Sequence, residues 1–136
     1  MVRVNSLFPE VKGVLEALKG KFKLGLISNS IVENATILLQ HLGLKRFFDV
    51  VVISGEENLN KPDPEVFRRA LERIGVTASE AMMVGDSLGD DIKGAKSVGM
   101  TAVWVNRSGK KIDSHIKPDY IIMNLRKLLD VVQVSS

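Results

Sequence analysis

The apolar residues of this chain switch between two spacings along the sequence, and this alternation constrains the fold more than any other feature. Short, nearly continuous apolar runs of strand length, such as DVVVI at 49–53 and TAVWV at 101–105, are separated by segments in which apolar residues recur at helical spacing. Strands that are apolar on both faces and alternate with helices are typical of a parallel sheet covered by helices on both sides. The sequence therefore predicts a doubly wound α/β fold of three layers, α/β/α.

Capping residues, prolines and glycines set the bounds of the predicted elements, because they favour helix starts, first turns and left-handed helix ends. Predicted helices begin at Pro9, Ser30, Asp63 and Asp90 and end near Leu18, Gly43, Gly75 and Gly99, and a last amphipathic helix covers 125–132. Predicted strands cover 22–27, 49–53, 82–85, 101–105 and 119–122, and Thr77–Glu80 is predicted as a capping box before a short helical turn.

Composition narrows the class of protein. A chain of 136 residues is the size of one domain, so 1–136 is predicted as a single domain, and 45% apolar residues are enough to build a core. No apolar stretch reaches the roughly 18 residues of a membrane span. The start MVRVNSLFPE also lacks the pattern of a signal peptide. We therefore expect a cytoplasmic protein without a membrane partner.

Charge and side-chain composition exclude nucleic-acid binding and metal sites built from cysteine or paired histidine. The formal net charge is only +3, the basic residues are scattered, and aromatic residues make up 5%, so no nucleic-acid partner is expected. The sequence has no cysteine, and His41 and His115 lack the paired spacing of a histidine metal site. Any metal is therefore expected to be held by oxygen ligands.

Polar residues follow the predicted strands at the edge where such sheets bind ligands, beyond the carboxyl ends of the strands. Ser28, Asn29, the backbone N–H groups there and the start of the next helix offer donors and partial positive charge to an anion, and a phosphate fits such a cradle. Lys61, in a loop fixed by prolines, is expected to place its ammonium against the same phosphate. The full set of candidates is Ser28, Asn29, Ser54, Glu56, Asp86, Asp90, Asp91 and Asn106, with Lys61 from the loop.

Two carboxylates after the strand at 82–85 form a candidate metal site. Asp86 and Asp91 have four residues between them across a turn into a helix, a spacing that lets both face one hard cation. With no cysteine or paired histidine, Mg²⁺ is the expected ion. Asp86 is the strongest candidate, since a carboxylate at a buried strand end is costly unless it meets a cation or donors. Asp91 is preferred over Asp90 on spacing, although the helix dipole favours acidic residues in a first turn in any case.

This ordered set resembles the haloacid dehalogenase (HAD) superfamily of hydrolases. In that resemblance Ser28 in LISNS is the second motif, Lys61 in KPDP is the third, and GDSLGDD with Asp86 and Asp91 is the fourth. The acidic form of the fourth motif is similar to the Mg²⁺-dependent phosphatase branch, which implies a small phosphorylated metabolite as substrate and charge stabilisation by Lys61.

The sequence departs from the family at one decisive point. Family members begin with a strand that ends in Asp-x-Asp-x-Thr/Val, in which the first Asp is the nucleophile and the second the general acid/base, and a cap insertion follows. This sequence contains no such motif and no cap, so the resemblance assigns no nucleophile to this chain. In the family the missing strand is central, between the strand that ends at Ser28 and the strand that ends before Asp86, and its loss is expected to leave unpaired sheet edges.

Several segments could occupy the position of the missing central strand. The N-terminal MVRVN alternates apolar and polar residues and could form a short substitute strand, which would bring Asn5, a residue unable to act as nucleophile, to the vacant position. A second chain could donate a strand, as in a split enzyme, or two copies could exchange an element as a homodimer. The chain could also be a fragment of a complete hydrolase.

The sequence therefore supports two functions of different class. The first is the core of a HAD-like phosphohydrolase whose aspartate nucleophile is absent from this chain, so that activity of the chain alone is left open. The alternative is a non-catalytic module that binds Mg²⁺ and phosphate, or a protein partner. A receiver-like phospho-acceptor domain fits less well, because receivers carry their acidic pair after the first strand and the order here differs.

Overall fold

The computed structural model describes residues 10–28, 43, 45–53, 63–109 and 115–132. All strand pairs in this part of the chain are parallel, and the strands lie in two sheets, one of order β1-β2 and one of order β3-β4-β5. The strands are β1 (Gly25–Ser28), β2 (Val50–Ile53), β3 (Met82–Gly85), β4 (Thr101–Val105) and β5 (Tyr120–Ile122).

Helices connect the strands and cover both faces of the sheets. The α-helices are α1 (Glu10–Leu18), α4 (Pro64–Ile74), α5 (Lys93–Ser97) and α6 (Leu128–Val131). Short helical turns complete the described part: η1 (Lys45–Phe47), η2 (Ala78–Glu80), the π-helical turn η3 (Leu88–Ile92), which runs on into α5, and η4 (Leu125–Lys127), which runs on into α6. None of the helices described here has the length and hydropathy of a membrane span.

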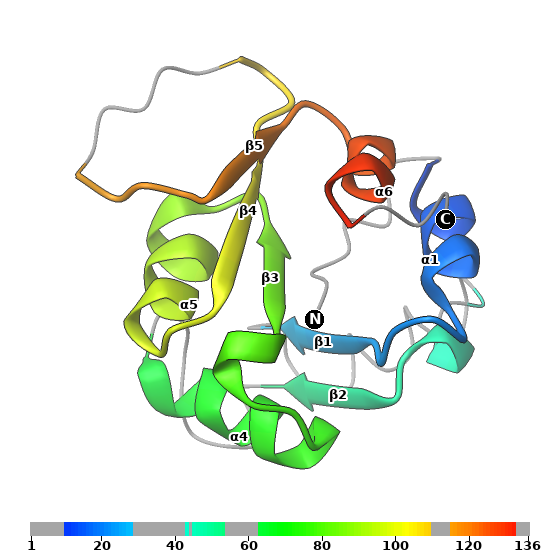
Figure 1. Ribbon diagram of the computed structural model, residues 1–136, viewed down its shortest axis with the longest axis horizontal. Coiled ribbons are helices and arrows are strands. Elements are labelled where there is room, and N and C mark those ends of the chain that lie inside the picture. Colours follow the sequence, from blue (N-terminus) through cyan, green and yellow to red (C-terminus); the bar gives the residue numbers. More distant parts are fainter. Residues whose placement is uncertain (1–9, 29–42, 44, 54–62, 110–114, 133–136) are drawn as a thin grey trace.

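Two buried apolar clusters lie on opposite faces of the strands. One joins α1 and α6 to inward-facing residues of both sheets, such as Leu26 of β1 and Val84 of β3. The other joins α4 and α5 to the alternate residues, such as Ile27 of β1 and Met83 of β3. Figure 1 shows α1 and α6 on one side of β3, and α4 and α5 on the other. The predicted doubly wound, three-layer α/β/α fold is confirmed.

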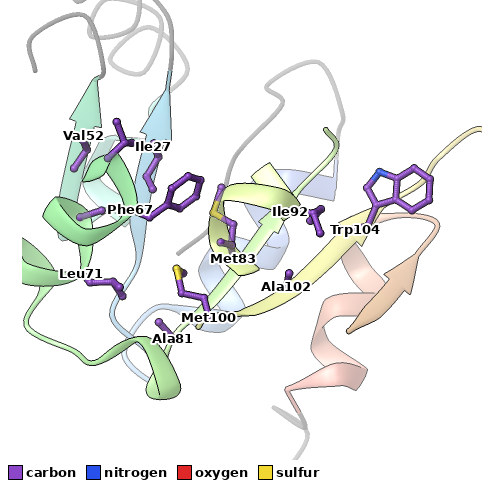
Figure 2. Close-up of a cluster of buried hydrophobic side chains, with 13 residues drawn as sticks. Ile27, Val52, Phe67, Leu71, Ala81, Met83, Ile92, Met100, Ala102 and Trp104 are labelled. Carbon is purple, nitrogen blue, oxygen red and sulfur yellow. The ribbon is translucent and has the colours of Figure 1, made fainter. Parts of the chain in front are cut away.

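Phe67 of α4 joins the two sheets within the second cluster. The ring is fully buried, and Figure 2 shows it between Ile27 of β1 and Met83 of β3. The ring also lies against Gly94 of α5, where a Cβ would collide with it. A single aromatic side chain therefore holds β1, β3, α4 and α5 together.

Among the residues that the structure describes, β1 pairs with β2 and β3 pairs with β4, and no strand ladder joins β1 to β3. The two apolar clusters contain residues of both sheets, so they join β1 and β3 on both faces. The unpaired edges expected from the missing central strand stay a prediction.

One aspartate before each outer strand fixes that strand to its neighbour, and we call this pair of contacts an aspartate clamp. Asp49, before β2, accepts from the Leu24 N–H at 2.7 Å and returns its own N–H to the Leu24 carbonyl at 2.7 Å. Asp119, before β5, makes the same two contacts with Ala102, at 2.8 and 2.9 Å. These backbone hydrogen bonds lower the pKa of both carboxyls against the opposing effect of burial, and Lys19 and Lys96 add to the lowering.

Most predicted bounds are confirmed, and the caps explain why. Asp63 accepts from the Glu65 N–H at 2.9 Å at the start of α4, and Gly75 ends that helix with a φ of +81°. Thr77 and Glu80 form the predicted capping box, with the Thr77 N–H donating to Glu80 at 3.2 Å. The Thr77 side chain and backbone lower the pKa of Glu80.

Two predicted bounds are wrong, and one element cannot be compared. β1 begins at Gly25 rather than Phe22, because the turn that follows α1 still holds the Phe22 N–H on the Leu18 carbonyl and leaves Phe22 46% exposed. The helix predicted from Asp90 begins earlier, at Leu88. The predicted helix 30–43 lies outside the described residues except for Gly43, whose φ of +67° is left-handed as expected.

Candidate functional site

The candidate site described most fully is the turn that leaves β3. β3 ends at Gly85, and the chain passes through Asp86 and Ser87 into η3. The Ser87 carbonyl accepts from the N–H groups of Asp91 at 2.9 Å and Ile92 at 3.2 Å, and the second of these bonds spans the wider turn of a π-helix. This turn brings Asp91 back onto the end of the strand.

Asp91 is the buried carboxylate of this turn. Its side chain has no solvent exposure, and its Oδ2 accepts from the Ser87 N–H at 3.2 Å. A Cβ at Gly85 would collide with the carboxylate, so only a glycine at the end of β3 leaves room for Asp91. Because a buried carboxylate is costly unless it is bonded or paired, its position here is built into the fold.

Asp86 differs from the sequence-based expectation. It was expected to be the costly carboxylate at a buried strand end, but the residue is exposed, and the buried carboxylate is Asp91. The chain leaves the sheet directly after Gly85, so Asp86 already lies outside the two apolar layers. Its backbone is nevertheless fixed, since its carbonyl accepts from the indole Nε1 of Trp104 at 3.1 Å.

Asp90 lies in the same turn as Asp91 but is not packed in the same way. It is half-buried, and its N–H donates to the Ser87 Oγ at 3.1 Å, so Ser87 acts as a local cap. The fold therefore brings Asp86, Asp90 and Asp91 into one turn. Which of these side chains binds a metal stays a prediction.

The predicted phosphate side is described only in part. Ser28 is the last residue of β1, opposite Ile53 of β2. The Ser28 side chain, Asn29 and Lys61 lie outside the described residues, so their approach to a phosphate stays a prediction.

The carboxylate oxygens of this turn are ligands of the type that Mg²⁺ prefers, but they are few. Carboxylate oxygens are the ligands that Mg²⁺ prefers, and Asp86 and Asp91 offer them at the end of one strand. Within the described ranges, no group of three or more His, Asp or Glu side chains is placed to hold a metal ion. Further oxygen ligands would have to come from water, from substrate or from residues beyond this turn.

Sequence reasoning missed one ion pair at the carboxyl end of β4. Arg107, two residues after β4, contacts Glu10 of α1 at 2.5 Å, and the Glu10 side chain is only 8% exposed. Burial opposes ionisation of Glu10, but its own N–H and Arg107 lower its pKa overall. The pair fastens the first turn of α1 to the sheet. Its residues are almost 100 positions apart in the chain, so no local pattern signals it.

Known proteins are similar to this chain in both sequence and structure. Residues 2–99 match the haloacid dehalogenase-like hydrolase family. The phosphoserine phosphatase of Thermus thermophilus is 39% identical over 123 residues, which cover 90% of this chain and 49% of that enzyme.

Two solved structures agree. A 2-haloacid dehalogenase from Pseudomonas syringae is 40% identical, with a TM-score of 0.85, over 95% of this chain and 54% of that one. The HAD-hydrolase YfnB from Bacillus subtilis, whose structure is bound to magnesium, is 28% identical, also with a TM-score of 0.85, over 93% of this chain and 55% of that one.

The extent of these matches decides what they establish. This chain spans about half the length of the curated relatives it matches, so the likeness covers the part of those proteins that corresponds to the sheets and helices described above. The family match covers well over half of this chain. The chain therefore belongs to the haloacid dehalogenase-like hydrolase family.

Proposed function

We propose that this chain is the core of a Mg²⁺-dependent phosphohydrolase that acts on a small phosphorylated metabolite. The turn after β3 is the observation that carries the proposal, because Gly85 and Ser87 hold Asp91 buried beside the exposed Asp86. The phosphatase activity of the Thermus relative and the magnesium in the YfnB structure support the same chemistry.

In this proposal the two carboxylates divide the work. Asp91 cannot swing away, because it is packed against Gly85, so it supplies a fixed oxygen ligand. Asp86 is exposed and supplies a second ligand that the cation can reach from solvent. Mg²⁺ bound there would neutralise charge on a phosphate.

The phosphate would be held by Ser28, Asn29 and Lys61. Ser28 stands at the carboxyl end of β1, the strand end at which such sheets bind anions. Its hydroxyl and the Asn29 amide would donate to the phosphate oxygens, and the Lys61 ammonium would offset negative charge that develops during transfer.

The reacting carboxylate has no counterpart in this sequence. Phosphoryl transfer through a covalent intermediate needs an in-line nucleophile and a proton donor for the leaving alcohol, and the sequence lacks an Asp-x-Asp motif. We therefore expect the chain alone to bind Mg²⁺ and phosphate without turnover. The lack of that motif also supports a second candidate, a non-catalytic module that binds Mg²⁺ and phosphate or a protein partner.

Mg²⁺ titration calorimetry, run beside hydrolysis of p-nitrophenyl phosphate, tests the proposal. Unmodified chain, Asp86→Asn and Asp91→Asn would be compared with Asp130→Asn, an exposed aspartate of α6 that serves as the matched control. Binding should be lost in the first two variants and retained in the control. Asp90→Asn decides the remaining choice, since loss of Mg²⁺ there but not in Asp91→Asn would contradict the assignment of Asp91.

The hydrolysis assay separates the two candidate functions. Turnover that disappears in Asp86→Asn would mean that a carboxylate elsewhere replaces the missing nucleophile. A folded chain that binds neither Mg²⁺ nor phosphate would contradict the phosphohydrolase core and leave an interaction role.

A further inference from the structure

The peptide group between Asp86 and Ser87 is held at both edges in the candidate metal site. Its carbonyl accepts from the indole Nε1 of Trp104 at 3.1 Å, and its N–H donates to Oδ2 of Asp91 at 3.2 Å. In a trans peptide group the C=O and the N–H point in opposite directions, so Trp104 and Asp91 contact opposite edges of one planar unit. A single peptide group therefore links the indole to both carboxylates that we propose as metal ligands.

Trp104 is placed firmly enough to anchor this peptide group. It lies on β4 beside Gly85 of β3 in the parallel ladder, and its side chain is only 4% exposed. The indole belongs to the apolar cluster of Figure 2, which also contains Met83 of β3 and Ile92 of η3. A buried indole needs a partner for its N–H, and the Asp86 carbonyl supplies one. Packing in the core thus sets the position of the indole nitrogen.

The bond from Trp104 differs from the hydrogen bonds that Ser87 makes. The Ser87 Oγ and carbonyl accept from the N–H groups of Asp90, Asp91 and Ile92, and these bonds stay within the turn. Trp104 lies on a neighbouring strand, 18 positions along the chain from Asp86. Bonds within the turn persist when the turn moves as a whole, whereas a bond from β4 fixes the turn relative to the sheet.

This anchoring matters for Mg²⁺, because the ion demands nearly ideal ligand geometry. Without the indole donor, the peptide group would be free to rotate, which would turn the Asp86 side chain and take the Ser87 N–H away from Asp91. The bond to the carbonyl also polarises the peptide group, which makes the Ser87 N–H a stronger donor to the Asp91 carboxylate. Both effects act on the two carboxylates together.

We propose that Trp104 is a positioning residue of the metal site, which acts through the peptide group between Asp86 and Ser87 to hold both carboxylates in place for Mg²⁺. This role rests on the proposed function, because Asp86 and Asp91 must bind the cation for Trp104 to affect it. Loss of a group that orients metal ligands typically weakens metal binding by about 10–100-fold, and we expect about tenfold here.

Replacement of the indole N–H alone tests the proposal, because Trp104 is the only tryptophan of the chain. Benzothienylalanine at this position keeps the size and shape of the side chain but carries sulfur in place of the N–H. Fluorotryptophan keeps the N–H and is the matched control. Calorimetric titration of the full chain with Mg²⁺ should give about tenfold weaker binding with the first analogue and unchanged binding with the second.

Two variants separate positioning from a purely structural role of Trp104. Trp104→Phe removes the N–H and some packing, whereas Met100→Val removes packing in the same cluster at a residue that is 2% exposed and lies outside the turn. Both variants should lower the urea midpoint, but only Trp104→Phe should weaken Mg²⁺ binding. Equal weakening in both would overturn the proposal and leave Trp104 as a core residue.

Hydrogen exchange followed by NMR measures the peptide group itself in the absence of metal. The Ser87 amide should exchange faster in the protein with benzothienylalanine, because its bond to Asp91 is weakened, while amides of the β1–β2 ladder keep their rates. An unchanged rate for Ser87 would overturn the proposal.

The calorimetric results also distinguish this role from the proposed function. Mg²⁺ binding of equal affinity in the unmodified chain and in the protein with benzothienylalanine would overturn the role of Trp104 and leave the phosphohydrolase core standing. Absence of Mg²⁺ binding in the unmodified chain would overturn the proposed function, and the role of Trp104 with it.

Discussion

The two halves of the sheet are fastened alike at their amino ends and differ at their carboxyl ends. In both halves an aspartate clamp fixes the outer strand to its neighbour, with Asp49 on Leu24 and Asp119 on Ala102. Each clamp also has a lysine, since Lys19 lies 3.5 Å from Asp49 and Lys96 lies 3.0 Å from Asp119. The outer pairings are therefore held by polar contacts as well as by ladder hydrogen bonds.

The β3 half carries an addition at the opposite edge. There Gly85, which has no side chain, leaves room for the buried Asp91 at the end of the strand. The carboxylates at the amino ends fix strand pairing, whereas those at the carboxyl end of β3 are the ones we propose as metal ligands. Among the described residues, the two apolar clusters join the β1 half to the β3 half.

The largest effect is expected where one side chain joins the halves. Phe67→Ala should lower the free energy of unfolding by about 3–5 kcal/mol, because it removes a fully buried ring that packs on both sheets and on Gly94. Urea unfolding followed by circular dichroism measures it. Phe22→Ala is the control, since Phe22 is 46% exposed, and an equal loss in both variants would contradict the role of Phe67 as the joint.

The two clamps should contribute similar amounts. Asp49→Asn and Asp119→Asn each weaken a charge-assisted hydrogen bond to a strand N–H, and because both carboxylates are partly exposed we expect about 1 kcal/mol for each. The double variant should lose the sum, because the clamps share no partner. Urea unfolding of the unmodified chain, the two single variants and the double variant measures these losses in the free energy of unfolding. A loss confined to one clamp would break the comparison.

Acid should weaken both clamps together. Both pKa values are lowered in the folded protein, so near pH 4 the unfolded chain binds more protons, and the stabilisation by the clamps is complete only well above the unfolded pKa of about 4. That stabilisation should disappear as the pH falls from about 5 through the folded pKa values. Urea midpoints from pH 7 to pH 3 should fall less steeply in the double asparagine variant. An equally steep fall of the urea midpoint in the unmodified chain and in the double variant would mean that the two aspartates do not cause the acid sensitivity.

The smallest effect is expected for the lysines. Lys19→Gln and Lys96→Gln each remove a partly exposed ion pair, and each should cost about 0.5 kcal/mol or less. The shorter contact at Asp119 should make Lys96→Gln the costlier of the two in low salt, and 1 M NaCl should remove the difference. A difference that persists in high salt would point to packing of the lysine stem instead of charge.

The elements themselves were predictable wherever local chemistry sets them. The Asp63 cap, Pro64 and Gly75 bound α4 as expected, and the apolar runs of β3 and β4 coincide with the observed strands. The start of β1 was not predictable in this way. Phe22 reads as part of an apolar run, but the turn after α1 holds its N–H, and only the packed structure shows that the side chain stays outside the core.

In the candidate site, too, some features follow from local sequence and others from the tertiary structure. Spacing alone placed Asp86 and Asp91 near one another after β3. Which carboxylate is buried depended on the π-helical turn, a local geometry that no spacing rule predicts. The Glu10 and Arg107 pair was invisible for a related reason, since it joins distant parts of the chain.

The sequence by itself determined the layer order, the parallel strands and the family, because apolar periodicity and capping act over a few residues and survive in any tertiary context. Only the tertiary structure decided that Asp91 rather than Asp86 is buried, that Phe67 joins the halves, and that a cavity opens between the turn after α1 and β3. These features depend on which side chains meet across the core, and close packing among residues far apart in sequence decides that.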